Sequence, residues 1–179
     1  MIEADLWRAI IGVLRTGLDV QGLNAIAIKQ SFQPRKQGAN SQDTIYLFKV
    51  TTKRVGSQGR KYEYNENNDE FDGQENYWIE ATYQLTPVIN RDVSDSSSRT
   101  SYDIADLCAA ILQSYDARKK LLESGIGILR IGDIRNPFST NDREQFQQDS
   151  NFDFTLTYQQ IYSTTVPVAD PIEQDMQRV

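Results

Sequence analysis

The stretch Tyr77–Val88, YWIEATYQLTPV, decides the fold of this sequence. Its large apolar residues alternate with polar ones, and this two-residue period is typical of a β-strand with one face toward a core. Such a strand provides half of a core and needs a second layer to cover it. The residues predicted to face the core are Tyr77, Ile79, Ala81, Tyr83 and Leu85.

Two segments with helical spacing are expected to form the second layer. In residues 4–18 and 100–115 the apolar side chains recur every three or four positions, as along one face of a helix. Thr100 and Asp103 have the spacing of a capping box, which predicts where the second helix begins. A further helical segment is predicted to end at Gly125, as a C-terminal glycine cap. The predicted buried side chains are Leu6, Trp7, Ile10, Val13 and Leu14 in the first helix and Ile104, Leu107, Cys108, Ile111, Leu112 and Tyr115 in the second.

Further segments have the β-branched and aromatic content of strands. We expect residues 25–32 and 44–55 to pair in one sheet across a turn at Pro34–Gly38. Residues 126–131 are predicted to alternate as a strand, with glycines that let a neighbouring element approach closely. The last predicted strand places four large side chains on one face, namely Phe152, Phe154, Leu156 and Tyr158.

The order of helix, strands, helix and strands predicts an α+β fold. The 179 residues fit a single domain. We expect a mixed or antiparallel β-sheet packed against an N-terminal helix and a long central helix, with an extended hairpin. Residues 1–165 are assigned to this domain. Residues 166–179 contain two prolines and few apolar anchors, and they are predicted to form an extended C-terminal arm.

The composition excludes most catalytic chemistry. The sequence has no histidine and a single cysteine, so it lacks the residues of Ser-His-Asp, Cys-His and zinc sites. Cys108 lies on the apolar face of a predicted helix and is interpreted as a core thiol. The 25 acidic and 19 basic residues give a net charge of −6, which argues against a broad nucleic-acid-binding surface. We therefore predict a protein that is not an enzyme, has no cofactor or metal, is made in the cytoplasm and has no membrane span.

Two short motifs partly match the sequence patterns of ligand sites but lack residues or spacing that those sites require. NENNDEFDG, residues 65–73, spaces its Asn and Asp residues as a calcium loop does, but Glu70 stands where that loop requires glycine. A polar hairpin tip is the favoured interpretation. GSQGRK, residues 56–61, has only part of a phosphate-loop spacing and is interpreted as a β-turn between strands.

Charges near the middle of the sequence are segregated by sign. Between Lys49 and Lys61 every charged residue is basic, and from Glu63 to Glu80 every one is acidic. A hairpin of this kind either pairs with the same hairpin of a neighbouring subunit or neutralises itself, and the residues leave both open. The candidate contact residues on it are Lys53, Arg54, Arg60, Lys61, Glu66, Asp69 and Glu70.

The whole pattern resembles the bacteriophage neck and tail-terminator proteins, in particular the phage neck terminator group. The resemblance covers residues 2–167, although residues 65–75 and 90–101 depart from the family pattern. It rests on the opening helix, on YWIEATYQLTPV and on four further stretches: QPRKQGANSQDTIYLFKV (33–50), SYDIADLCAAILQS (101–114), LLESGIGILRIGDIRNPF (121–138) and REQFQQDSNFDFTLTYQQIYSTTVP (143–167).

This resemblance implies a virion structural protein that forms a ring of about six copies. The ring would cap the tail tube, stop its polymerisation and join the tail to the head connector. The implied partners are copies of the chain itself, the tail tube protein, the head-to-tail connector proteins and, as a further candidate, the tail sheath. DNA would pass through the lumen only as cargo, and no membrane is involved.

Alternatives remain at this point. The same virion context suits a head-completion or connector protein, or a structural protein associated with the tail tube. A soluble acidic regulator or enzyme is the alternative from another class. Arg130, Asp133 and Arg135 are candidates for contacts with other subunits or with the connector, and a solvated surface is the alternative interpretation for them.

Overall fold

The computed structural model describes residues 3–30, 42–67, 69–90, 98–140, 146–148 and 150–167. Within these residues, no helix is long and apolar enough to cross a membrane. The elements in chain order are α1 (Glu3–Val20), β1 (Ala27–Gln30), β2 (Thr44–Asn65), β3 (Glu70–Val88), α2 (Ser101–Gln113), α3 (Tyr115–Glu123), β4 (Ile126–Ile131), β5 (Phe138–Thr140), β6 (Phe146–Gln148) and β7 (Phe152–Pro167).

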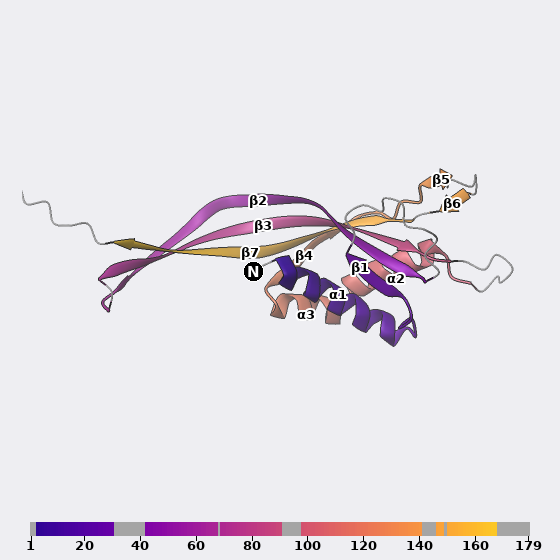
Figure 1. Cartoon of the computed structure of the whole chain (residues 1–179), viewed down its shortest axis with the longest axis horizontal. Helices are drawn as coiled ribbons and strands as arrows, with labels where there is room; N and C mark the ends of the chain where they lie inside the picture. Colours follow the sequence, from indigo (N-terminus) through magenta and orange to yellow (C-terminus); the bar gives the residue numbers. More distant parts are fainter. Residues whose placement is uncertain are drawn as a thin grey trace, which may run out of the picture.

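A five-stranded sheet with the order β1-β2-β3-β7-β4 organises the fold. β1 runs parallel to β2, and the other neighbouring strands are antiparallel. The helices α1, α2 and α3 lie together on one face of this sheet (Figure 1). The predicted α+β fold with a mixed sheet is therefore confirmed. Strands β1 and β2 do share this sheet, while the turn predicted at Pro34–Gly38 lies outside the described residues.

The core lies between the helices and the half of the sheet that they cover. Trp7 of α1 meets Tyr83 of β3 edge-on, with 5.0 Å between ring centroids, and Tyr83 stacks on Phe154 of β7 at 5.6 Å. Burial raises the pKa of Tyr83 above its ordinary value, so the core keeps a neutral phenol. The predicted inward faces of the first helix, of β3 and of β7 are buried, except that Tyr77 is only partly buried.

The segment after Thr100 forms two helices in succession. The predicted capping box is confirmed, because the Asp103 N–H donates to Thr100 Oγ1 at 3.1 Å and the Thr100 N–H donates to the Asp103 carboxylate at 2.7 Å. Ser114 has extended backbone between α2 and α3, and its hydroxyl accepts from the Ala117 N–H. The prediction that Tyr115 lies in the buried stripe is wrong. The break at Ser114 interrupts the helical repeat, and the Tyr115 side chain is 78% exposed.

Strand β4 enters the sheet directly after α3. Gly125 has φ 74°, the left-handed conformation that ends many helices, as predicted. At Gly127 a Cβ would lie 2.7 Å from Thr157 Oγ1 of β7, which confirms the predicted close approach. A bulge beside Arg130 interrupts the predicted alternation. Arg130 consequently faces solvent, while Ile131 stays partly buried against the core.

Strands β2, β3 and β7 continue past the helices as a three-stranded ribbon (Figure 1). We call residues 59–65 of β2, 70–76 of β3 and 161–167 of β7 the distal ribbon. Its three strands pair row by row without a bulge. The outer strands do not extend this far, because β1 stops pairing with β2 at Leu47 and β4 pairs with β7 no further than Tyr158.

The ribbon changes two interpretations made from the sequence. The β-turn predicted for GSQGRK is wrong, because these residues stay within β2 and include a bulge between Val55 and Gly59, with Gly56 at φ 78°. Strand β7 runs through Pro167, so the first residues assigned to the C-terminal arm belong to the sheet. Residues 168–179 of that predicted arm lie outside the described residues.

Candidate functional site

The two faces of the distal ribbon differ in character. Side chains alternate along a strand, so the register assigns each residue to one face. One face continues the surface that the helices cover in the body, and we call it the aromatic face. Its large apolar side chains are all exposed, and they are Tyr62, Tyr64, Phe71, Tyr162 and Val166, with the Arg60–Glu75 ion pair on the same face.

Gly73 lies in the middle of the aromatic face, beneath the ring of Tyr62. A Cβ on Gly73 would lie 2.9 Å from Tyr62 Cε1 and 2.9 Å from Thr164 Cγ2. The ring therefore fills the space that the missing side chain leaves. In the next row Tyr64 and Phe71 meet with 5.4 Å between ring centroids. On the aromatic face these side chains therefore pack against one another, and no described element covers them.

Gly73→Ala is expected to loosen the ribbon while leaving the body intact. The added Cβ must displace the Tyr62 ring, and overpacking of this kind costs about 1–3 kcal/mol. Hydrogen exchange of the backbone amides in residues 59–76 should therefore become faster, and exchange in α1 and α2 should not change. Gly59→Ala is the matched control, because its nearest neighbour, Asn76 Cβ, lies at an ordinary 3.8 Å. Equal protection in both variants would show that the Tyr62 contact does not hold the ribbon.

The opposite face of the ribbon is polar apart from the exposed side chain of Ile161. Lys61 and Glu63 form an ion pair there, and Asn65 Nδ2 donates to Asp72 Oδ2 at 3.0 Å. Gln74 and Ser163 share a row with Lys61 and are exposed. A single-layer ribbon with one aromatic and one polar face can meet two different environments at once.

The bases predicted as contact residues lie mostly beside acids of the same chain. Lys53 lies opposite Glu80 at 3.9 Å, and Arg60 opposite Glu75 at 3.4 Å, each pair joining β2 to β3. Arg54 instead lies over the ring of Tyr77, 4.8 Å from its centroid. For these residues the geometry favours the self-neutralising hairpin over charge pairing with a neighbour. Pairs this exposed contribute less than about 1 kcal/mol each.

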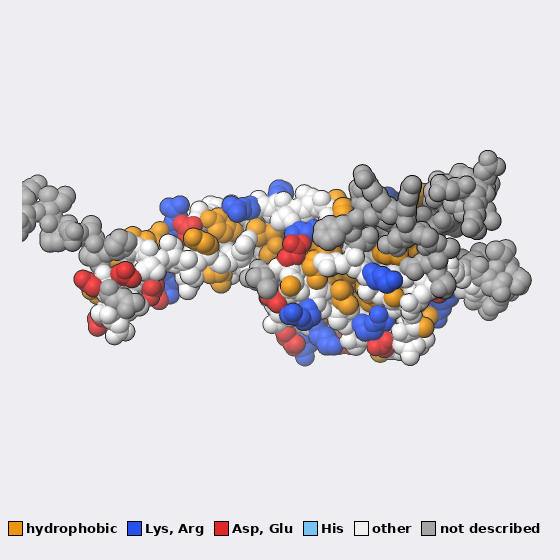
Figure 2. Space-filling model, viewed as in Figure 1, with side chains coloured by type: hydrophobic (Ala, Val, Ile, Leu, Met, Phe, Trp, Pro, Cys, Tyr) orange, Lys and Arg blue, Asp and Glu red, His pale blue; other side chains and the backbone are white. Residues whose placement is uncertain are grey.

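The predicted acidic residues gather at the turn between β2 and β3. Glu66, Asp69 and Glu70 lie in a stretch, residues 62–75, that contains six acidic residues and no base, namely Glu63, Glu66, Asp69, Glu70, Asp72 and Glu75. In Figure 2 acidic side chains gather at the end of the ribbon. Tyr64 Oη donates to Asp69 Oδ1 at 2.6 Å, and this bond raises the pKa of Tyr64 above its ordinary value. The ribbon thus ends in a tip with excess negative charge.

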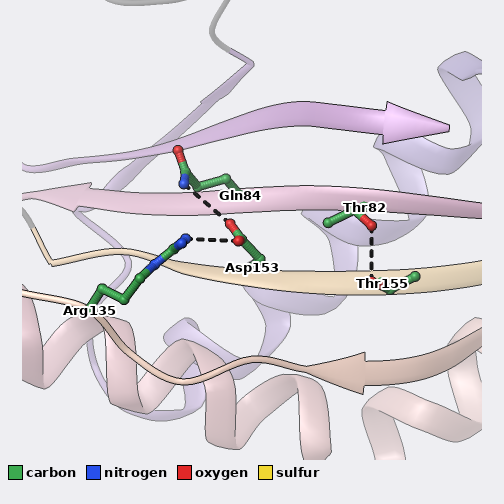
Figure 3. Close-up of polar contacts among 5 residues, drawn as sticks. All are labelled: Thr82, Gln84, Arg135, Asp153 and Thr155. Atoms are coloured by element: carbon green, nitrogen blue, oxygen red, sulfur yellow. Dashed lines mark hydrogen bonds and ion pairs between the residues drawn. The ribbon is translucent and has the colours of Figure 1, made fainter.

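Arg130, Asp133 and Arg135 do not form one cluster. Arg135 forms an ion pair with Asp153 at 2.8 Å, and Gln84 Nε2 donates to the same carboxylate at 3.2 Å (Figure 3). Arg130 and Asp133 are exposed, and within the described residues neither forms an ion pair. Arg135 therefore fastens the segment after β4 onto the sheet, while the other two remain available for external contacts.

The helix-free face of the sheet in the body carries short polar side chains. Thr82 and Thr155 hydrogen-bond through their hydroxyls at 3.0 Å, next to the group around Asp153 (Figure 3). This polar surface and the polar face of the distal ribbon lie on the same side of the sheet, opposite the helices, with the exposed side chains of Trp78 and Ile161 between them.

Catalytic or metal chemistry has no support in the described part of the chain. Within those residues no group of three or more His, Cys, Asp or Glu side chains is placed to hold a metal ion. Cys108 is buried, and burial raises the pKa of its thiol to about 12, which makes it a poor nucleophile near neutral pH.

Sequence reasoning missed the third strand of the ribbon. The signal was present in residues 159–166, QQIYSTTV, which are rich in β-branched and aromatic residues and contain no charge. What the sequence does not reveal is that these residues pair with the acidic strand 70–76. That partner follows from the register set in the core and not from any local motif.

Comparison with known proteins connects this architecture to phage assembly. The family model described as E217 gateway protein gp29 matches residues 5–168. Among solved structures, the chain is similar to the sheath/tube terminator of the PVC extracellular contractile injection system in its extended state. That likeness has a TM-score of 0.55 and 11% identity, and it covers 100% of this chain and 64% of the terminator chain. No curated protein matches. Because the family model matches nearly the whole chain, the protein belongs to the E217 gateway protein gp29 family, a family of phage neck and tail-terminator proteins.

Proposed function

We propose that this protein is a tail terminator of the phage neck. It assembles as a ring, caps the tail tube, stops tube polymerisation and joins the tail to the head connector. The observation that carries the proposal is the family match over residues 5–168, and the shared fold with a sheath/tube terminator supports it. The ring has about six copies by family analogy, and such rings arise from heterologous contacts between identical subunits.

The proposed partners are other copies of the chain, the tail tube protein and the head-to-tail connector proteins, with the tail sheath as a further candidate. Two features of the subunit suit this role. The body is a packed two-layer core, and the distal ribbon projects from it with open edges and exposed aromatic side chains. The net charge of −6 suits a ring through which DNA passes without binding.

The test is polymerisation of the tail tube protein of the same phage with and without this protein. We expect tubes of restricted length, with a ring of density at one end in negative-stain images. As a control, a preparation unfolded and kept in urea during purification, then diluted to the same final urea concentration as the folded one, should leave the tube lengths unchanged. Unrestricted tubes with no density at either end would contradict the terminator role.

A head-to-tail adaptor is the second candidate, favoured by the word "gateway" in the description of the matched family. An adaptor would bind the head connector and leave tube lengths unrestricted. The same preparation incubated with isolated connector complexes separates the two roles, because a terminator binds tubes in the absence of any connector.

A further inference from the structure

The outer edge of β7 in the distal ribbon is open and unguarded. Proteins usually protect long free edges with charges, prolines or bulges, because an exposed row of N–H and C=O groups pairs readily with another strand. Here residues 154–166 contain no charged residue and no proline, Pro167 lies only in the last row of the distal ribbon, and β7 has no bulge there. Beyond Tyr158 no described strand pairs with this edge.

The outer edge of β2 in the distal ribbon is open as well. Residues 59–65 pair with β3 on one side, and no described strand lies on the other side. This edge matches the β7 edge in length, because every row of the distal ribbon includes one residue of each strand. The ribbon therefore presents two complementary edges on its opposite sides.

We propose that the β7 edge of one copy pairs with the β2 edge of the next copy, so that the ribbons join into a continuous sheet around the ring. This inference rests on the proposed ring and specifies the contact that closes it. Strands β2 and β7 are both antiparallel to β3 and thus run in the same direction. Copies related by rotation therefore join them in parallel, as β1 and β2 already pair within the body.

We call this pairing of a β7 edge with the β2 edge of the next copy the joint. The charges along the two edges are compatible with it. The bases on the β2 edge already lie beside acids of their own ribbon, Arg60 beside Glu75 and Lys61 beside Glu63. The β7 edge brings no charge of its own, so the joint introduces neither an unpaired charge nor like-charge repulsion. Main-chain hydrogen bonds are the attractive contribution, and high salt does not weaken them as it weakens exposed ion pairs.

The joint also indicates which face of the sheet lines the channel of the ring and which face points outward. The helices occupy one face only, and in a closed ring the bulkier layer takes the outer circumference (Figure 1). The polar face then lines the channel. Among its bases, Lys53, Lys61 and Arg135 each have a carboxylate beside them, while Arg130, opposite Thr155, has no ion pair within the described residues. Few unpaired positive charges therefore remain to hold the phosphates of passing DNA. The aromatic face points outward, where it packs against the surrounding structure.

Paired cysteines test the joint directly in the full chain. Ser163→Cys is combined in turn with Gly59→Cys, Lys61→Cys or Glu63→Cys, whose residues lie on the same face of the ribbon as Ser163. Within one copy these positions lie two strands apart, about 9.5 Å, which is too far for a disulfide. Disulfides can therefore form only between copies. The native Cys108 is buried with a raised pKa and does not compete.

Oxidation is carried out on the concentrated protein and on protein bound to tail tubes, at low and at high salt. We expect one of the three pairs to give a ladder of cross-linked copies on a non-reducing gel at both salt concentrations, and each single cysteine to give none. Dimers from Ser163→Cys alone would overturn the proposal, because they indicate two β7 edges paired about a twofold axis. The absence of a ladder for all three pairs, in solution and on tubes, would also overturn it.

The second test places a charged residue on the open edge of β7. Ser163→Lys places a lysine on the open edge strand, as natural edge strands do to prevent pairing, and should lower assembly by at least about tenfold, while Gln58→Lys, in the bulge of β2, should not. Ser163 is exposed, Gln58 is partly buried, and neither belongs to the core, so circular dichroism should show equal folding. Equal assembly of the two variants would contradict the joint. Capped tubes without a cross-linked ladder would contradict the joint and support the terminator role. A ladder together with uncapped tubes would support the joint and contradict the terminator role.

Discussion

Phe154→Ala should lower the free energy of unfolding by about 3–5 kcal/mol, the usual cost of removing a buried aromatic ring. Phe154 is 1% exposed and lies between Tyr83 at 5.6 Å and Phe152 at 6.1 Å between ring centroids. No nearby side chain can fill this space without leaving the stack. Domains of this size have a free energy of unfolding of only about 5–15 kcal/mol, so this loss is a large fraction of it. Urea denaturation followed by far-UV circular dichroism measures it.

Tyr162→Ala is the matched control for this prediction. Tyr162 is on the same strand as Phe154, but it lies in the distal ribbon and is 61% exposed. Its removal should change the free energy of unfolding by less than about 0.5 kcal/mol. Similar losses of free energy of unfolding for the two variants would mean that the core is not concentrated under the helices. They would also mean that the ribbon and the body unfold as one unit.

Gly17→Ala should destabilise the protein although it replaces a glycine inside a helix. Gly17 lies where α1 crosses α2, and a Cβ there would be 2.5 Å from Ile111 Cγ2 and 2.7 Å from Cγ1. These atoms adjoin the Ile111 backbone and cannot swing away, so the overpacking costs about 1–3 kcal/mol. The thermal midpoint should fall accordingly, and differential scanning calorimetry detects this.

Gly12→Ala in the same helix supplies the opposite expectation. A Cβ at Gly12 would have no neighbour within 4 Å, so the variant should gain about 0.5–1 kcal/mol from the better helix propensity of alanine. In an Ile111→Ala background the penalty of Gly17→Ala should disappear, which a double-mutant cycle can measure. If Gly17→Ala stabilises the wild-type background as much as Gly12→Ala does, the close crossing of α1 and α2 is incorrect.

The body of the fold is predictable because its signals are local and periodic. The alternation from Tyr77 to Leu85 and the capping box at Thr100 each concern residues that are close in sequence, and both are confirmed. One failure occurs where a local break interrupts a periodic pattern. Tyr115 fits the helical stripe by spacing, but a single extended residue, Ser114, breaks the helix before it.

The candidate site is less predictable than the core. The segregation of charge along the hairpin is visible in the sequence, but only the register between β2 and β3 shows that Lys53 meets Glu80 and Arg60 meets Glu75. The open edge of β7 has no motif at all. Its recognition depends on knowing which strand pairs with β3 and where β4 stops.

The order of strands in the sheet also sets the timing of folding. β3 lies at the centre between β2 and β7, yet β2 precedes it directly while β7 begins only at Phe152, long after β3 ends at Val88. Pairing across such a separation is slow, because the two strands must come together across a long intervening segment. During synthesis on the ribosome, β2 and β3 therefore wait as a two-stranded hairpin until α2, α3 and β4 have emerged. A chain interrupted before Phe152 never presents the β7 edge, so under the proposed joint such a faulty subunit would be left out of the ring without any separate inspection step.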